Sequence, residues 1–214
     1  MADAVRLDRV TRLFDGAAAV TALDLTVPVG EVLLVEGANG SGKSTLLRVV
    51  ATALSPTFGS GTVLGADLVR HRSWIRARVE LLGHESRCYP DLTAAENLRF
   101  VCSLFGDAPA GVGPALERAG LEDVADVRAG SFSQGMRQRL ALARTLVRRP
   151  ELLLLDEPYA ALDADARGLV DDVVTEGRRW GQTVLLASHE APPAGLVDRT
   201  VRMDAGRLAA EVPA

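Results

Sequence analysis

Short apolar runs recur along the chain and alternate with stretches of helical periodicity. Runs of four or five apolar residues without alternation are typical of strands buried on both faces of a parallel sheet. We predict such strands at Glu31–Val35, Val79–Gly83, Leu152–Leu155 and Thr183–Ala187, and helices at Ser44–Val50, Gln134–Val147 and Ala164–Trp180. This alternation predicts an α/β protein with a mainly parallel central sheet.

Two regions depart from the alternation. Residues Val5–Val27 show the pattern of two short strands around a turn at Asp15 and Gly16, which predicts an N-terminal antiparallel β part. Residues 93–147 have helical periodicity, interrupted by a Gly- and Pro-containing stretch. We interpret this block as a helical subdomain inserted into a single domain, residues 1–214.

The composition narrows the functional class. The 214 residues are 48% hydrophobic but only 4% aromatic, as expected for an aliphatic interior around parallel strands. The net charge of −4 argues against nucleic acid as a partner. Cys88 and Cys102 lack metal-ligand spacing and are predicted to be reduced, packed thiols. Residues Met1–Arg6 show no signal peptide, and no apolar run approaches membrane-spanning length.

Lys43 is the only lysine of the chain, since the other 23 basic residues are arginines. It lies in the pattern G-x-x-x-x-G-K-S between a predicted strand and a predicted helix, the arrangement of a phosphate-binding loop. Its compact ammonium reaches β- and γ-phosphate oxygens as a planar guanidinium does not. We predict a nucleoside triphosphate with Mg²⁺, bound by Gly37, Ala38, Asn39, Gly40, Ser41, Gly42, Lys43, Ser44 and Thr45.

Two adjacent carboxylates end the predicted strand Leu152–Leu155. In a phosphate-loop enzyme the first acid, Asp156, holds Mg²⁺ alongside the Ser44 hydroxyl. The second acid, Glu157, is placed to polarise an attacking water molecule. A strand end with ordinary surface acids is the alternative, and the phosphate loop makes it the weaker one.

The segment Phe132–Met136 precedes this acidic strand, and here the chain resembles the ATP-binding cassette ATPases, whose signature is most often Leu-Ser-Gly-Gly-Gln. The resemblance implies a phosphate-loop NTPase fold and a head-to-tail homodimer that hydrolyses ATP. In such a dimer, Ser133 and Gly135 meet the γ-phosphate of the ATP held by the other protomer. Gln134 and Met136 depart from the commonest signature, whereas Ser133 and Gly135 keep it.

The same resemblance implies four further roles, and its motifs extend from Phe14 to Met203. Phe14 corresponds to the aromatic residue that stacks on adenine, with a plain core position as the alternative. Asp163 corresponds to the loop that couples the two nucleotide sites. His189 corresponds to the switch histidine that senses the γ-phosphate. His84 stands where the family usually places a glutamine that contacts the metal and the nucleophilic water.

Within the family, the chain looks like the haem-exporter ATPase of cytochrome c maturation. The features behind this interpretation are His84, the segment Leu92–Leu98 and the segment Ser133–Arg139. The resemblance implies integral membrane subunits as partners, a peripheral position at the cytoplasmic face of the inner membrane, and Glu85–Pro90 as the loop that receives the partner. ATPases of drug or polysaccharide exporters are the alternative.

Two other classes fit less well. A phosphate-loop kinase or GTPase has no use for the signature segment or for His189, and a guanine-reading Asn-Lys-x-Asp needs a second lysine. A soluble, non-transport cassette protein would need a coiled-coil insertion or a second cassette, and neither fits in 214 residues.

Overall fold

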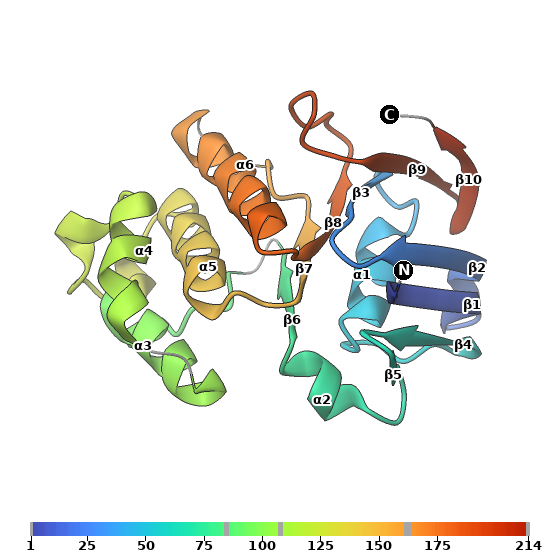
Figure 1. Cartoon of the computed structure of the whole chain (residues 1–214), viewed down its shortest axis with the longest axis horizontal. Coiled ribbons are helices and arrows are strands. Elements are labelled where there is room, and N and C mark those ends of the chain that lie inside the picture. The colour runs from blue at the N-terminus through green and yellow to red at the C-terminus, as the bar shows by residue number, and fades with distance from the viewer. Residues whose placement is uncertain (1, 84–85, 107–108, 161–163, 213–214) are drawn as a thin grey trace.

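The computed structural model describes residues 2–83, 86–106, 109–160 and 164–212, and it has a layered α/β arrangement (Figure 1). The central sheet has the strand order β10-β9-β3-β8-β7-β6. Pairing is parallel from β9 through β6 and antiparallel between β9 and β10. These strands are β3 (Val32–Glu36), β6 (Val79–Leu82), β7 (Leu152–Asp156), β8 (Thr183–Ser188), β9 (Arg199–Asp204) and β10 (Arg207–Val212). The predicted mainly parallel sheet is confirmed.

The central strands are apolar on both faces because each face has its own core. Along β3, Leu33 and Val35 belong to a core shared with helix α1 (Lys43–Val50) and the second sheet. Val32 and Leu34 point to the opposite face, into a core shared with the remaining large helices. Successive side chains of a strand alternate between faces, so an uninterrupted apolar run fits a sheet that is covered on both sides.

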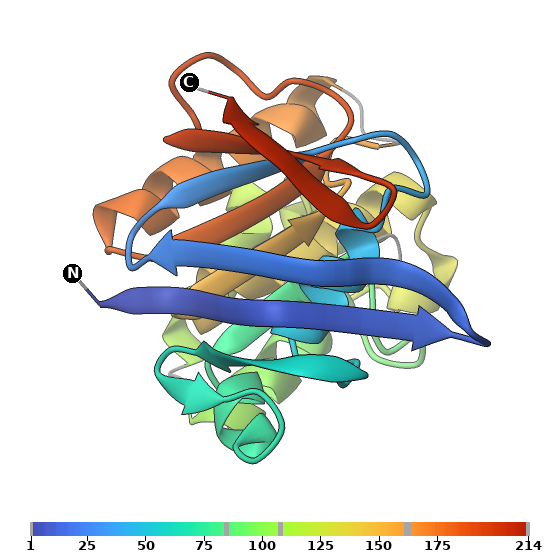
Figure 2. The same cartoon turned by 90° about the vertical axis from the view of Figure 1, so that its right-hand side faces the viewer.

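The second sheet is antiparallel, with the order β2-β1-β4-β5, as predicted for the N-terminal part (Figure 2). Its strands are β1 (Asp3–Phe14), β2 (Ala17–Pro28), β4 (Phe58–Val63) and β5 (Ala66–Asp67). The hairpin between β1 and β2 turns at Asp15 and Gly16, both of which have positive φ, as two-residue hairpin turns require. Both hairpin strands are 12 residues long, so the prediction of short strands was wrong.

A group of helices covers the other face of the central sheet. It contains α3 (Ala94–Phe105), α4 (Val112–Arg118), α5 (Gln134–Arg148) and α6 (Ala164–Arg179). Short 3-10 turns lie at Pro109–Gly111, Glu122–Val124 and Ala129–Ser131. A further short helix, α2 (Arg72–Arg76), precedes β6. Thr93 begins α3 with a capping box, in which its side chain and that of Glu96 accept each other's backbone N–H. Helix α4 begins inside the stretch where a break was predicted, because Gly111 and Gly113 tolerate a helical backbone.

Both cysteines are reduced thiols, as predicted. Cys102 is buried among the helices, and Cys88 is half-buried against them. Burial raises the pKa of the Cys88 thiol, and the Ser86 hydrogen bond and nearby arginines oppose that rise only in part. A thiol of raised pKa is protonated and chemically quiet at neutral pH.

A buried charge cluster joins the central sheet to α5. Glu80 on β6 is 8% exposed, and its carboxylate pairs with both Arg144 and Arg148 of α5. Arg148 also donates to the carbonyl oxygens of Val79 and Arg76, each at 2.8 Å. Arg144 donates to Glu80 at 2.8 Å and to the Ser86 carbonyl oxygen at 3.1 Å. Two guanidinium groups are thus held inside the protein by one carboxylate and several carbonyl oxygens.

Removing this carboxylate is expected to destabilise the fold. Glu80→Ala leaves two buried guanidinium groups without their counter-ion, and we expect the free energy of unfolding to fall by about 3–5 kcal/mol. The matched control is Glu151→Ala, which removes the exposed partner of Arg78 and should change stability by less than about 1 kcal/mol. Urea denaturation of both variants measures the difference. Equal losses would contradict the assignment of Glu80 as a structural counter-ion.

Candidate functional site

The phosphate loop, residues 37–44, connects the end of β3 to the start of α1. Gly40 and Gly42 have φ values of +80° and +107°, which side-chain-bearing residues rarely adopt. At Gly42 a Cβ would also lie 2.3 Å from the Ala19 carbonyl oxygen, so only glycine fits there. Gly42 caps α1 without a side chain, which leaves the N–H groups of the first helical turn for an anion.

The Lys43 ammonium sits at the centre of this loop and is only 4% exposed. Its Nζ donates to the carbonyl oxygens of Gly37 at 2.7 Å and Ala38 at 3.2 Å. It also forms an ion pair with Glu157, with 3.1 Å between Nζ and Oε1. These three contacts account for the three donors of an ammonium group. An incoming phosphate oxygen must therefore compete with the Glu157 carboxylate for Lys43.

Ser44 and Asp156 meet at the base of the loop. The Ser44 hydroxyl donates to Asp156 Oδ1 at 2.8 Å, and Asp156 is buried at the end of β7. The two oxygens are hard ligands of the kind that Mg²⁺ takes, and Mg²⁺ completes its shell with waters and phosphate oxygens. Across the described part of the chain, no group of three or more His, Cys, Asp or Glu side chains could hold a metal ion. The Ser44 hydroxyl and the Asp156 carboxylate are oxygen donors of the kind that suit a Mg²⁺ shared with phosphate oxygens.

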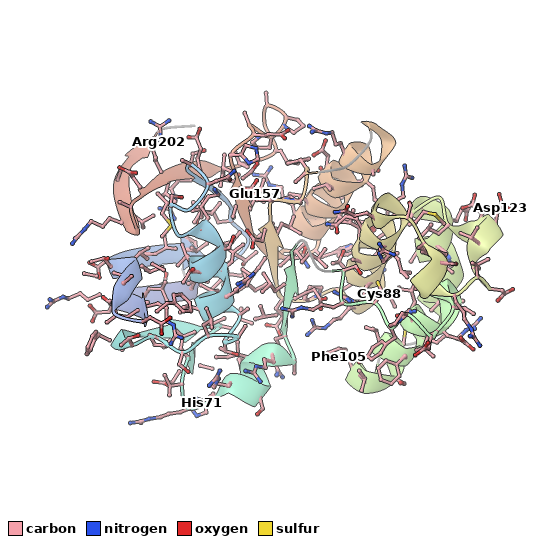
Figure 3. The ribbon with its side chains drawn as sticks, turned by 180° about the vertical axis from the view of Figure 1, so that it is seen from behind. His71, Cys88, Phe105, Asp123, Glu157 and Arg202 are labelled. Atoms are coloured by element: carbon pink, nitrogen blue, oxygen red, sulfur yellow. The ribbon has the colours of Figure 1, made fainter. Side chains whose placement is uncertain are left out.

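Glu157, which is labelled in Figure 3, links the phosphate loop to His189. One carboxylate oxygen faces Lys43, and the other lies 2.7 Å from Nδ1 of His189 and accepts its backbone N–H at 3.3 Å. Burial raises the pKa of this carboxyl group, but the hydrogen bonds with Lys43 and His189 outweigh burial and lower it. Glu157 is therefore ionised at neutral pH, as an acceptor of a proton from water must be.

The hairpin of β9 and β10 packs against the phosphate loop and supports its backbone. The N–H of Gly206, at its turn, donates to the Ser41 carbonyl oxygen at 2.9 Å, and the Gly206 carbonyl accepts the Thr21 N–H at 2.8 Å. A Cβ at Gly37 would lie 2.3 Å from the Met203 carbonyl oxygen, so the hairpin packs directly on the loop backbone. Sequence reasoning missed this support, because its contacts are made by backbone groups.

Phe14 lies at the end of the β1–β2 hairpin and is 41% exposed, so it is not the plain core residue of the alternative interpretation. Register places it opposite Ala17, two residues from Ala19. Since the Ala19 carbonyl borders Gly42, the hairpin end lies beside the phosphate loop.

The signature residues lie apart from this cluster. Ser133 caps α5, where its hydroxyl accepts the Met136 N–H at 3.2 Å, and its side chain is exposed. Gly135 is partly exposed, and a Cβ at this position would lie 4.0 Å from the Ser133 hydroxyl. Helices α5 and α1 occupy opposite faces of the central sheet (Figure 1), so one chain does not bring Ser133 to its own Lys43. His84 and Asp163 lie outside the described residues.

The comparisons with known proteins agree with this geometry. Residues 20–160 match the family described as ABC transporter. The chain belongs to the ABC transporter family. It is an ATP-binding subunit of such a transporter and an ATPase, as its relatives and structural neighbours are. Within the described ranges, no helix of this ABC subunit is both long and apolar enough to cross a membrane.

Relatives named for different processes have similar sequence identity to the chain. The chain is 36% identical to the ABC transporter ATP-binding protein NatA of Bacillus subtilis, over 80% of the chain and 72% of NatA. It is 38% identical to the daunorubicin/doxorubicin resistance ATP-binding protein DrrA of Streptomyces peucetius, over 97% of the chain and 64% of DrrA. It is also 38% identical to the cytochrome c biogenesis ATP-binding export protein CcmA of Cupriavidus necator, over 89% of the chain and 83% of CcmA.

Among solved structures, the chain resembles a dimeric ATP-binding cassette in a post-hydrolysis state bound to ADP and Pi. The TM-score is 0.87 at 25% identity, with 98% of both chains covered. A second structure, described as the ATP-binding subunit of an ABC transporter, has a TM-score of 0.90 at 24% identity. Both likenesses establish a phosphate-loop cassette fold.

Proposed function

We propose that this ABC ATPase drives haem export for cytochrome c maturation, with integral membrane partners at the cytoplasmic face of the inner membrane. The observation that carries the proposal is the similarity to CcmA, which extends over 89% of the chain and 83% of CcmA. Two segments behind the sequence resemblance, Leu92–Leu98 and Ser133–Arg139, form the capped beginnings of α3 and α5. Drug export is the second candidate, because DrrA is equally identical to the chain.

In the proposed reaction, Lys43 exchanges one partner for another. The γ-phosphate of ATP displaces Glu157 from the ammonium, and the carbonyl oxygens of Gly37 and Ala38 keep Nζ aimed into the loop. Glu157 keeps His189 as its partner, and its released oxygen accepts a proton from the attacking water. His189 holds the Glu157 carboxylate in place, and in the proposed reaction its ring also contacts the γ-phosphate.

Ser44 and Asp156 are the residues that would hold Mg²⁺. The bound cation would neutralise charge on the β- and γ-phosphates. The rest of the phosphate charge falls to Lys43 and to the N–H groups at the start of α1, as proposed for Gly37 to Thr45.

The active form is proposed to be a homodimer with two composite ATP sites. The exposed Ser133 and the partly exposed Gly135 at the start of α5 suit a surface that approaches another molecule. The separation of α5 from α1 across the sheet supports a second chain as the source of the signature residues. The similar dimeric cassette, bound to ADP and Pi, supports the same arrangement.

A groove beside the loop after β6 is the proposed seat of a helical loop from the membrane subunit. It has a volume of about 190 Å³ and lies between α3, α5 and this loop, with Tyr89, Val101, Leu104 and Phe105 among its lining residues. Tyr89 and Leu104 are 49% and 59% exposed. Asn97 fixes the loop on α3 by accepting the Tyr89 N–H and donating to its carbonyl oxygen. The groove therefore presents apolar side chains beside the charged Glu80, Arg87 and Arg144.

Glu157→Gln is expected to separate ATP binding from hydrolysis. The amide keeps the size of the side chain but cannot accept a proton, so turnover should fall by about a hundredfold or more, while ATP binding persists and the dimer accumulates. Sedimentation with ATP and phosphate release measure both properties. Glu151→Gln, an exposed change just before β7, should leave both unchanged. A Glu157→Gln protein that stays monomeric and hydrolyses ATP normally would refute its assigned role.

Paired substitution of Arg87 and Tyr89 by alanine tests the groove. We expect the isolated subunit to keep its basal ATPase rate and to lose stimulation by the membrane subunits, because only exposed side chains of the docking loop are removed. Arg70→Ala with Trp74→Ala is the matched control on α2 and the segment before it. Full stimulation of the Arg87 and Tyr89 variant in the assembled transporter would exclude this groove.

Deletion of the gene tests the cargo. For haem export, we expect c-type cytochromes to lose covalent haem while other haem proteins keep theirs, as measured by haem staining and absorbance. Complementation with wild type should restore attachment, and Lys43→Arg should fail, since a planar guanidinium does not replace the ammonium in the loop. Normal c-type cytochromes with a lost drug-export phenotype would favour the second candidate.

A further inference from the structure

The exposed ring of Phe14 stacks on the guanidinium group of Arg12. Arg12, two residues earlier on β1, places its guanidinium carbon 4.6 Å from the centre of the Phe14 ring. This distance is within the range of a cation–π contact. Because one face of the ring is covered by Arg12, the exposed 41% of Phe14 belongs to its edge and its other face.

The Arg12 side chain is anchored from behind. Its guanidinium donates to the Ser55 carbonyl oxygen at 3.1 Å, in the loop that follows α1. Its Nε is buried and has no acceptor among the described residues. A buried N–H without an acceptor lowers stability. The contacts of the guanidinium with the Phe14 ring and with the Ser55 carbonyl oxygen offset this cost and keep Arg12 in place.

The same loop fixes the strand that carries both residues. Thr57 donates its N–H to the Thr11 carbonyl oxygen at 2.7 Å, and its hydroxyl accepts the Leu13 N–H at 3.1 Å. Residues 55–57 therefore hold the backbone on either side of Arg12. The loop before them is the continuation of α1, whose first residue is Lys43.

We propose that Arg12 is a positioning residue of the base site, which fixes the Phe14 ring and makes its free face a better platform for adenine. The proposal rests on the proposed ATPase function and on the role that the family resemblance implies for Phe14, which is to stack on adenine. A cation over one face draws π-electron density toward itself, and the opposite face then attracts an electron-rich purine more strongly. Arg12 would act through Phe14 and would not touch the nucleotide.

A second arginine–aromatic pair provides a matched control. Arg78 lies over the Trp74 ring at 4.0 Å, and Trp74 belongs to α2. Arg72 and Arg76 of that helix donate to the Thr52 carbonyl just beyond the C-terminal end of α1, whereas the phosphate loop is at the N-terminal end. Arg78→Met thus removes an equal charge and an equal stack away from the phosphate loop.

The experiment compares ATP with inorganic triphosphate, both with Mg²⁺, by titration calorimetry on the full chain. For Arg12→Met we expect about fivefold weaker binding of ATP, the effect of one exposed cation–π contact, and unchanged binding of triphosphate, which has no base. Arg12→Gln keeps a donor for the Ser55 carbonyl oxygen and should show the same selective loss, should the methionine variant fold poorly. Arg78→Met should bind both ligands as wild type does.

Phe14→Ala distinguishes the base-stacking role of Phe14 from the positioning role of Arg12. We expect it to weaken ATP by about tenfold, as the loss of one base–aromatic stack does, and to make Arg12→Met silent in the double variant. Wild-type ATP affinity for Phe14→Ala would overturn the proposed base site. An effect of Phe14→Ala without any effect of Arg12→Met or Arg12→Gln would overturn the role of Arg12 alone. Equal loss of ATP and triphosphate in the Arg12 variants would also overturn it, because it would indicate damage to the phosphate loop.

Discussion

The ion pair between Lys43 and Glu157 organises the nucleotide site. An ammonium buried to 4% exposure needs acceptors for its donors, and the loop backbone supplies only part of them. Glu157, at the end of β7 on the far side of β8, supplies the rest and in turn fixes His189 at the end of β8. One lysine thereby aligns the ends of three adjacent strands, β3, β7 and β8, which is where open α/β sheets bind their ligands.

The central sheet also determines what one chain does not achieve alone. Its two apolar faces bury α1 on one side and α5 on the other, so the phosphate loop and the signature residues face different parts of the surface. Lys43 is fixed by internal contacts, whereas Ser133 is exposed and Gly135 is partly exposed. The fixed donor Lys43 on one side of the sheet and the accessible start of α5 on the other side suit an ATP site that is completed when two chains associate.

Much of the fold could be predicted because apolar runs and glycine positions carry local information. The four central parallel strands, the phosphate loop and the acidic pair Asp156 and Glu157 follow from such patterns. The C-terminal strands escaped prediction because β9 and β10 mix apolar with charged residues and contain no uninterrupted apolar run of four or five. The cluster of Glu80, Arg144 and Arg148 escaped too, since charged residues are expected at the surface and their burial depends on tertiary pairing. The direct Lys43–Glu157 contact likewise depends on how β3 and β7 flank β8.

The bracing of the phosphate loop by the hairpin of β9 and β10 has a consequence for biosynthesis. Ser41 is held by Gly206, and Gly37 lies against Met203, so the loop reaches its final backbone only when these late residues are in place. During translation, the strand and helix around Lys43 leave the ribosome long before their support does. A nascent chain that has not yet produced this hairpin therefore lacks two of the contacts that hold its phosphate loop in the finished protein.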